Sequence, residues 1–256
     1  MSRFDLTGRK ALVVGIANSQ SIAFGIARGL REQGAEIAVT YLNDKARPHV
    51  EPCAQLVDAP LLLPLDVQKP GELEAVFESL RATWGRLDIL VHSIAFAPKE
   101  DLQGSLVNCS AAGFAQAMDV SVHSLLRMTK LALPLMTEGG TILTLTYQGS
   151  VRTLEGYQLM GPVKAALEST VRYLADDLGP RGIRVHALSP GPVATRAASG
   201  LKDFQRQIDV ARHRAPLGTN TQIDDVGGAA AYLCSPAAQH LTGLTLFVDG
   251  GLHFQG

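Results

Sequence analysis

The chain has 256 residues, of which 46% are hydrophobic and 18% charged, and 23 basic against 24 acidic residues leave a formal charge of −1. This composition excludes a disordered chain, and the charge balance argues against a nucleic-acid-binding protein, which normally carries a basic excess. No apolar run reaches the roughly 20 residues that span a bilayer, and no secretory signal is recognisable. The three cysteines are far apart and the histidines show no ligand spacing, so we expect a cytoplasmic protein with no membrane partner and no bound metal.

Short aliphatic runs alternate with amphipathic helical stretches along the chain. The expected strands are 10–16, 35–41, 61–66, 87–93, 140–147, 183–189 and 244–248. The expected helices are 21–33, 45–57 with breaks at two prolines, 70–84, 111–136, 158–178 and 221–234, whereas 196–215 are irregular. Apolar strands separated by helices predict a parallel sheet of about seven strands covered on both faces, a Rossmann-like doubly wound α/β fold. No linker or repeat divides the chain, so residues 1–256 are expected to form a single domain.

The loop after the first expected strand is the place where such a fold binds a dinucleotide phosphate. Gly15 can take the tight turn there, and Ser21, followed by Ile22, stands where a helix N-cap belongs. The open amides and partial positive charge of this helix end suit a pyrophosphate. The loop lacks the G-x-G-x-x-G pattern, however, so on its own it also fits an ordinary strand–helix turn.

Two further strand ends favour a dinucleotide site. Asp66 ends the third expected strand and Val67 follows it, at a place where a carboxylate can accept a hydrogen bond from an adenine amino group. Ser93, Ile94 and Ala95 end the fourth expected strand and can line the ribose and the nicotinamide.

The tip of the second expected strand is where the residue that reads the adenosine ribose should lie. An acid there indicates NAD and an arginine indicates NADP, but Leu42 is neither. The lack of a cation at the tip favours NADH. NADPH stays open because Lys45 and Arg47 could fold back toward the ribose.

Tyr157 and Lys164 form the candidate catalytic pair. Seven residues advance a helix by two turns, about 10 Å, with about 20° of angular drift, so both side chains are expected on one face. This requires a helix that begins near Gln158, because Pro162 is tolerated only in the first turn. A surface lysine and a packing tyrosine are the alternative, but their position after a strand at the cofactor edge favours catalysis.

Several segments resemble the short-chain dehydrogenase/reductase superfamily, and specifically its divergent branch, the bacterial NADH-dependent enoyl-acyl-carrier-protein reductases. The main branch has Tyr and Lys four residues apart, which would require a tyrosine at position 160, where this chain has Met160. The wider spacing and the Gly15 loop look like the enoyl reductases. So do the segments HSIAFAP at 92–98, LTY at 145–147 and AASG at 197–200, and the overall resemblance runs from LTGRK at 6–10 to VDGG at 248–251.

This resemblance implies hydride transfer to the β-carbon of a trans-2-enoyl thioester in fatty acid biosynthesis. It implies that Tyr157 stabilises the thioester oxygen, that Lys164 bonds the nicotinamide ribose, and that Tyr147 either takes part in catalysis or lines the pocket. Gly191, Val193 and Thr195 are expected to contact the cofactor. The substrate is expected to contact substrate-binding helices at about 195–216 and the mainly apolar residues Phe96, Ala97, Tyr147, Tyr157, Met160, Ala197, Ala198, Leu201 and Phe204.

The resemblance also implies partners. Lys202 and Arg206, four residues apart, are expected to meet an acidic acyl carrier protein, although for either residue taken singly a solvated helix face is the better explanation. The family is usually a homotetramer. The alternative activity is a reductase of the same superfamily that acts on a carbonyl, a 3-oxoacyl thioester or a small ketone. A cofactor-binding regulator without turnover is disfavoured because Tyr157 and Lys164 are both present.

Overall fold

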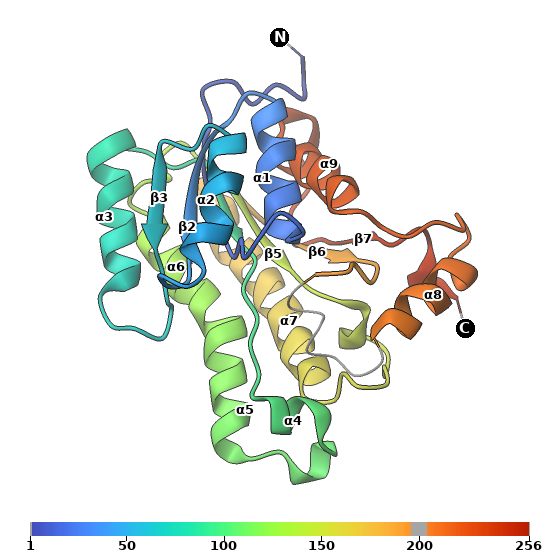
Figure 1. Ribbon diagram of the computed structural model, residues 1–256. Helices are drawn as coiled ribbons and strands as arrows, with labels where there is room; N and C mark the ends of the chain where they lie inside the picture. The colour runs from blue at the N-terminus through green and yellow to red at the C-terminus, as the bar shows by residue number, and fades with distance from the viewer. Residues whose placement is uncertain (1, 196–203, 256) are drawn as a thin grey trace.

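Seven parallel strands form a central sheet in the computed structural model, which describes residues 2–195 and 204–255 (Figure 1). The strands are β1 (Lys10–Val14), β2 (Glu36–Tyr41), β3 (Leu61–Pro64), β4 (Ile89–His92), β5 (Gly140–Leu145), β6 (Ile183–Pro190) and β7 (Thr245–Val248). Their order is β3-β2-β1-β4-β5-β6-β7. The chain therefore winds outward from β1, crosses back to β4 and winds outward again. The predicted doubly wound fold is confirmed, and ligands of such folds bind where the order reverses, between β1 and β4.

Helices cover both faces of the sheet because successive strand residues point to opposite sides. Leu12 and Val14 of β1 join one buried cluster, whereas Ala11 and Val13 join the other. The first face is covered by α3 (Glu72–Trp84), α5 (Ala111–Met118), α6 (Ser124–Ala132) and α7 (Met160–Leu178). The second face is covered by α1 (Ile22–Glu32), α2 (Arg47–Leu56) and α9 (Ile223–Cys234), and the two layers are visible in Figure 1.

The expected helix at 111–136 is divided in the structure. A π-helical segment, Asp119–His123, separates α5 from α6. Within this segment the hydroxyl of Ser121 accepts a hydrogen bond from the amide of Phe96 at 3.1 Å and donates one to its carbonyl at 3.3 Å. A helix with the ordinary repeat would turn Ser121 differently, so the irregular turn accompanies the contact between this layer and the segment that follows β4.

Other boundaries differ from the expectations by a few residues. Pro48 lies in the first turn of α2 and Pro52 inside it, so neither proline divides that helix. The helix α3 begins at Glu72 because Gly71 adopts a left-handed conformation, and Pro70 therefore precedes it. Part of the segment expected to be irregular forms α8 (Phe204–Arg214). Short elements complete the chain: α4 (Lys99–Gln103) and turns at Leu106–Asn108, Gln148–Ser150, Gly179–Arg181, Pro236–Ala238 and Leu252–Phe254.

The described part of the chain contains no helix long and apolar enough to cross a membrane. Cys53, Cys109 and Cys234 are free thiols.

Asp88 links the start of β1 to the start of β4, at the amino ends of the strands and therefore away from the cavity-forming carboxyl ends. Its carboxylate, only 3% exposed, accepts hydrogen bonds from the Lys10 amide at 2.9 Å, from Arg9 at 2.8 Å and from Arg86 at 3.1 Å. Burial alone raises the pKa of the Asp88 carboxyl, but the hydrogen bonds from Arg86, Lys10 and Arg9 outweigh it and hold this pKa below its ordinary range. The carboxylate thus stabilises the register that places Ala11 beside Ile89.

We expect Asp88→Asn to lower the free energy of unfolding by about 2 kcal/mol, because it removes the buried carboxylate that Arg9 and Arg86 share and leaves Arg86 only the exposed Glu138 as an anionic partner. Denaturant unfolding at pH 7 measures the change. The lowered pKa means that the contribution exists above about pH 4 and disappears as the pH falls through the folded value, so the two proteins should converge in acid.

Asp58→Asn is the matched control, because Asp58 is exposed and pairs with Arg31 on the surface at 2.9 Å. We expect it to cost less than about 1 kcal/mol. An equal loss of stability in both variants would contradict the structural role of Asp88.

Candidate active site

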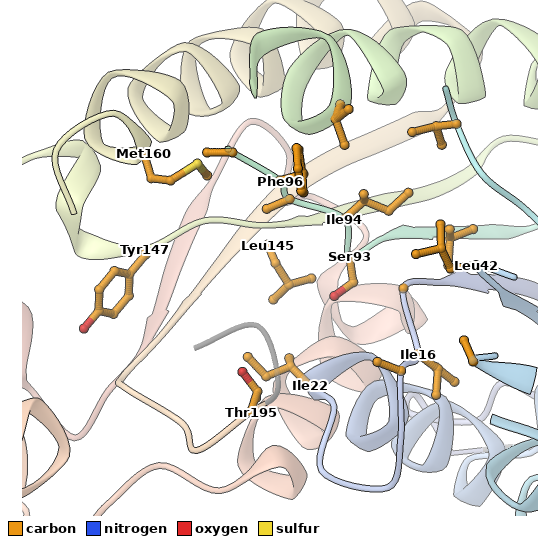
Figure 2. A pocket seen from close by; sticks show the side chains of 18 of the residues that line it. Ile16, Ile22, Leu42, Ser93, Ile94, Phe96, Leu145, Tyr147, Met160 and Thr195 are labelled. Carbon is orange, nitrogen blue, oxygen red and sulfur yellow. The ribbon is translucent and has the colours of Figure 1, made fainter. Parts of the chain in front are cut away.

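An elongated cavity of about 1130 Å³ runs along the carboxyl ends of the strands. Residues that end or follow β1 to β6 line it, so it spans the point where the strand order reverses. In Figure 2, Leu42 lies toward one end, Ser93 and Ile94 lie near the middle, and Tyr147 and Met160 lie toward the other end. This volume exceeds the upper range of ordinary small-molecule pockets, about 1,000 Å³, and therefore suits a dinucleotide together with a second ligand.

Nearly all the described residues that the sequence predicts for the site line this cavity. The expected coenzyme contacts on its wall are Gly15, Ile22, Leu42, Asp66, Val67, Ser93, Ile94, Ala95, Lys164, Gly191, Val193 and Thr195. The expected substrate contacts on its wall are Phe96, Ala97, Tyr147, Tyr157 and Met160.

A few of the predicted residues are not among those that line the cavity. Ser21 is described by the structure but is not among the residues that line the cavity. Four predicted residues lie outside the described part: Ala197, Ala198, Leu201 and Lys202. Phe204 begins α8, but its side chain is likewise outside the description, and Arg206 is exposed.

The loop between β1 and α1 is built differently from the expectation. Ser21 is the N-cap residue by backbone conformation, but its side chain makes no capping bond to α1. Its hydroxyl oxygen instead accepts hydrogen bonds from the amides of Ala17 at 3.0 Å and Asn18 at 3.1 Å. The Ser21 hydroxyl oxygen is therefore bonded to amides of the loop. It does not accept a hydrogen bond from the first-turn amides of α1. An anionic ligand can satisfy such amides.

Gly15 directly follows β1 and has a backbone conformation that other residues avoid. Its φ is +109°, and a Cβ at this position would lie 2.0 Å from the carbonyl oxygen of Ser93. The loops after β1 and β4 can therefore approach each other only because position 15 has no side chain. This close approach forms the floor of the cavity at the reversal point.

Polar residues other than the predicted contacts also line the cavity, and of these the sequence indicated only Lys45. Lys45 and His49 both line it, as do Thr40, Asn43 and Gln68. Arg47, the other cation left open by the sequence, does not point there. Its guanidinium lies 5.7 Å from the centre of the Tyr41 ring and 3.9 Å from the Glu51 carboxylate. Most of these residues lie close to the end of β2 in the sequence, and this position is the one sequence signal that could have identified them.

Tyr157 reaches the cavity by a route that the sequence did not predict. The helix α7 begins at Met160, two residues later than expected, so Tyr157 precedes the helix that carries Lys164. Tyr157 instead ends the loop before the helix, and its carbonyl accepts a hydrogen bond from the Gly161 amide at 2.9 Å. Pro162 lies in the first turn, where its missing amide costs no helical bond. The structure nevertheless brings Tyr157 and Lys164 together on the cavity wall.

Lys164 is buried, with 5% of its surface exposed, and its ammonium donates a hydrogen bond to the Leu145 carbonyl at 2.7 Å. Burial lowers the pKa of Lys164 to about 8, while the nearby Glu168 carboxylate opposes this shift. Glu168 in turn accepts a hydrogen bond from the Thr146 hydroxyl at 2.6 Å. Lys164 therefore remains mostly charged at neutral pH and presents a fixed cation at the cavity wall.

The two tyrosines of the site pack against each other. The rings of Tyr147 and Tyr157 lie 5.2 Å apart, centre to centre, in an edge-to-face arrangement with an interplanar angle of 67°. Burial raises the pKa of the Tyr157 hydroxyl well above its usual range, and the neighbouring Tyr147 and Glu168 raise it further. The Tyr157 hydroxyl is therefore protonated and can donate a hydrogen bond. Gly149 lies so close to this ring that a Cβ there would be 2.4 Å from it.

His92 is the last residue of β4. Its ring is fully buried between the hydroxyls of Thr144, at 2.9 Å, and Ser124, at 2.7 Å. Burial lowers its pKa to about 3, and the Lys164 charge contributes in the same direction, so the ring is neutral. No cluster of potential metal ligands occurs among the described residues.

Comparisons with known proteins agree with one another. The family model described as enoyl-(acyl carrier protein) reductase matches residues 15–253. The enoyl-[acyl-carrier-protein] reductase [NADH] of a Nostoc species is 44% identical over 98% of this chain and 99% of its own. A crystal structure of the Anaplasma phagocytophilum reductase in complex with NAD is 43% identical, with a TM-score of 0.94 over 98% of this chain and 96% of that one. The Bacillus cereus reductase with NADP+ and an indole naphthyridinone is 42% identical, with a TM-score of 0.95 over 98% of each chain.

We expect Gly149→Ala to destabilise the protein by about 1–3 kcal/mol, because the new methyl group overlaps the Tyr157 ring and must displace it. Denaturant unfolding measures this cost. In the control Gly228→Ala, within α9, a Cβ would meet no atom within 4 Å. There we expect no loss, or a gain of about 0.5–1 kcal/mol from helix propensity. Unchanged stability of Gly149→Ala would show that the loop can move away from the Tyr157 ring at no cost in free energy, and would contradict this prediction.

Proposed function

Because the chain belongs to the enoyl-[acyl carrier protein] reductase family of the short-chain dehydrogenase/reductase superfamily, we propose that it reduces the trans-2 double bond of enoyl thioesters with NADH, in fatty acid biosynthesis. One observation carries this proposal. Tyr147, Tyr157 and Lys164 line the same cavity as the residues expected to hold the coenzyme, with Met160 at the position where the main branch of the superfamily has its tyrosine.

The cavity fits a dinucleotide. The amino end of α1 lacks a side-chain cap, and Gly15 and Ile22 line the cavity beside it, so this end suits the pyrophosphate. Asp66 and Val67 would hold the adenine. When bound, NADH supplies the hydride that is added to the β-carbon of the enoyl thioester.

The nicotinamide end of the coenzyme would lie between β4 and the loop after β6. Ser93, Ile94 and Ala95 would line one side, and Gly191, Val193 and Thr195 the other, with Lys164 on the ribose. The relatives named as NADH-dependent reductases support NADH as the coenzyme. Leu42 at the tip of β2 offers no cation to a ribose phosphate, but Lys45 lines the same cavity and is the cation available to one, so an assay with NADPH is needed.

Tyr157 is the proposed electrophilic catalyst. Negative charge develops on the thioester oxygen as the β-carbon gains hydride, and the protonated Tyr157 hydroxyl donates a hydrogen bond to that oxygen. A preorganised donor of this kind contributes roughly 3 kcal/mol to transition-state stabilisation. Tyr147 supports the Tyr157 ring and borders the thioester, and Lys164 supplies a positive charge nearby. Solvent then protonates the α-carbon.

The acyl chain would occupy the apolar end of the cavity. Phe96, Ala97 and Met160 provide its described wall. We assign the rest of this wall to the substrate-binding segment 195–216, through Ala197, Ala198, Leu201 and Phe204. Apolar side chains around the acyl chain exclude water from the hydride transfer.

The same proposal includes a contact with acyl carrier protein and a homotetrameric assembly. Lys202 and Arg206 would meet the acidic acyl carrier protein, and residues 1–256 would act as one reductase domain in the cytoplasm. A homotetramer is supported by exposed apolar side chains on the helices after β4 and β5, namely Phe114, Leu126 and Tyr173.

The decisive experiment follows the loss of NADH absorbance with purified protein. We expect turnover with crotonyl and longer trans-2-enoyl thioesters, presented on acyl carrier protein and on coenzyme A, and little with 3-oxoacyl thioesters. Oxidation of NADH with 3-oxo substrates alone would support the alternative carbonyl reductase and overturn the proposal. The parallel assay with NADPH tests the coenzyme preference.

Tyr157→Phe serves as the control for that assay, because it removes one hydroxyl and keeps the ring that packs on Tyr147. It should lower kcat by about 100-fold while the Kd for NADH stays unchanged. Full activity in this variant would show that another group donates to the thioester oxygen.

The lowered pKa of Lys164 predicts a pH dependence of coenzyme use. The lysine is charged below its pKa of about 8 and neutral above it, so kcat/KM for NADH should be highest near neutral pH, fall to half of that value at about pH 8 and decrease further at higher pH. Steady-state kinetics over this range measures the inflection. Lys164→Arg keeps the charge at all these pH values and should remove the inflection. An inflection that persists in Lys164→Arg would assign it to another group.

A further inference from the structure

The turn Leu252–Phe254, here named the C-terminal turn, is a hydrogen-bonded element that the catalytic proposal does not use. The buried carboxylate of Asp249 accepts hydrogen bonds from the amides of Gly251 at 3.0 Å and His253 at 2.8 Å, and from the His253 ring at 3.0 Å. The His253 ring also stacks on Phe247 of β7, with the ring centres 4.0 Å apart. These contacts fasten the C-terminal turn to the end of the sheet.

On one side, the C-terminal turn is bound to the loop that carries Tyr147. The guanidinium of Arg152 donates hydrogen bonds to the carbonyl of Gln255, at 2.6 Å, and to that of His253. The Arg152 amide donates to the Gln148 carbonyl at 3.2 Å, next to Tyr147. Because a guanidinium is planar and offers several fixed donors, it holds two carbonyls in one orientation, and residues 147–152, the tyrosine loop, are thereby tied to the C-terminal turn.

On its other side, the C-terminal turn packs against α8. Leu252 forms a small buried cluster with Ala211 and Ala215, separate from the two large clusters that flank the sheet. The Leu217 amide adds a hydrogen bond to the Gly250 carbonyl at 3.2 Å. Figure 1 shows the C-terminus beside α8.

Tyr147, which begins the tyrosine loop, lies at the opposite end of the cavity from Leu42 (Figure 2). We propose that Arg152 is a positioning residue for the reduction: through the C-terminal turn it holds the tyrosine loop and α8 in a fixed relation and so sets the geometry of the substrate end of the cavity. The inference rests on the proposed function, which gives Tyr147 and the segment 195–216 their substrate roles.

The test compares Arg152→Leu with Arg152→Lys in the full chain. Arg152→Leu removes both hydrogen bonds, so we expect KM for the enoyl thioester to rise about tenfold while the Kd for NADH, measured by fluorescence titration, stays unchanged. Arg152→Lys can still reach one carbonyl and should give a smaller rise. Arg81→Leu is the matched control, because Arg81 lies on α3 and pairs with Glu78 of the same helix. It should leave both constants unchanged.

Hydrogen exchange gives a readout that does not depend on turnover. Peptides covering 204–215 should exchange faster in Arg152→Leu and in Leu252→Ala, which breaks the contact from the side of α8, and peptides of α1 should not change. Unchanged exchange at 204–215 in both variants would overturn the proposal. So would an equal loss of NADH affinity, because that would indicate general destabilisation.

These readouts separate the two proposals. If the wild-type protein fails to reduce enoyl thioesters, the proposed function is wrong, yet altered exchange at 204–215 would still establish the coupling. If the wild-type protein is active and Arg152→Leu leaves KM and exchange unchanged, only the positioning role fails. Should Arg152→Leu not fold, Arg152→Lys and Leu252→Ala decide the outcome.

Discussion

The hydrogen bond from the Lys164 ammonium to the Leu145 carbonyl is the interaction on which the site depends. It joins the fifth residue of α7 to the last residue of β5, with a donor–acceptor distance of 2.7 Å in a buried position. Burying an ammonium is costly unless it is paired and hydrogen-bonded, so this carbonyl and the nearby Glu168 carboxylate are what make a cation tolerable there. The cation is thereby fixed beside the cavity.

A second constraint comes from the topology of the sheet. All the parallel strands end at the same edge, so residues far apart in the chain meet there without any special local sequence. Close packing at that edge requires small groups at particular points. Gly15 allows the loops after β1 and β4 to touch, and Gly149 allows the tyrosine loop to lie against the Tyr157 ring. The cavity therefore results as much from missing side chains as from those that line it.

Much of the site could be predicted from the sequence because strand ends are recognisable. Runs of apolar residues locate the strands, and the residue after each run, such as Asp66 or Ser93, must then lie at the cavity. Recognition of the Tyr157–Lys164 spacing also identified the reductase family correctly. The helix that carries Lys164 begins two residues later than the sequence predicted, because a helix boundary depends on contacts as well as on propensity. Here Tyr157 ends a loop packed on Gly149, and α7 begins only at Met160.

The sequence by itself determined the fold class, the strand ends that form the site and the family, because hydrophobic periodicity and short motifs are local properties of a chain. Only the tertiary structure decided where individual polar groups find partners. It turned the Ser21 hydroxyl toward the loop instead of the helix, directed Lys45 and not Arg47 to the cavity, and brought Arg152 to the C-terminal turn. Such choices depend on which donors and acceptors become neighbours after the chain is packed, and separation along the sequence carries no information about them.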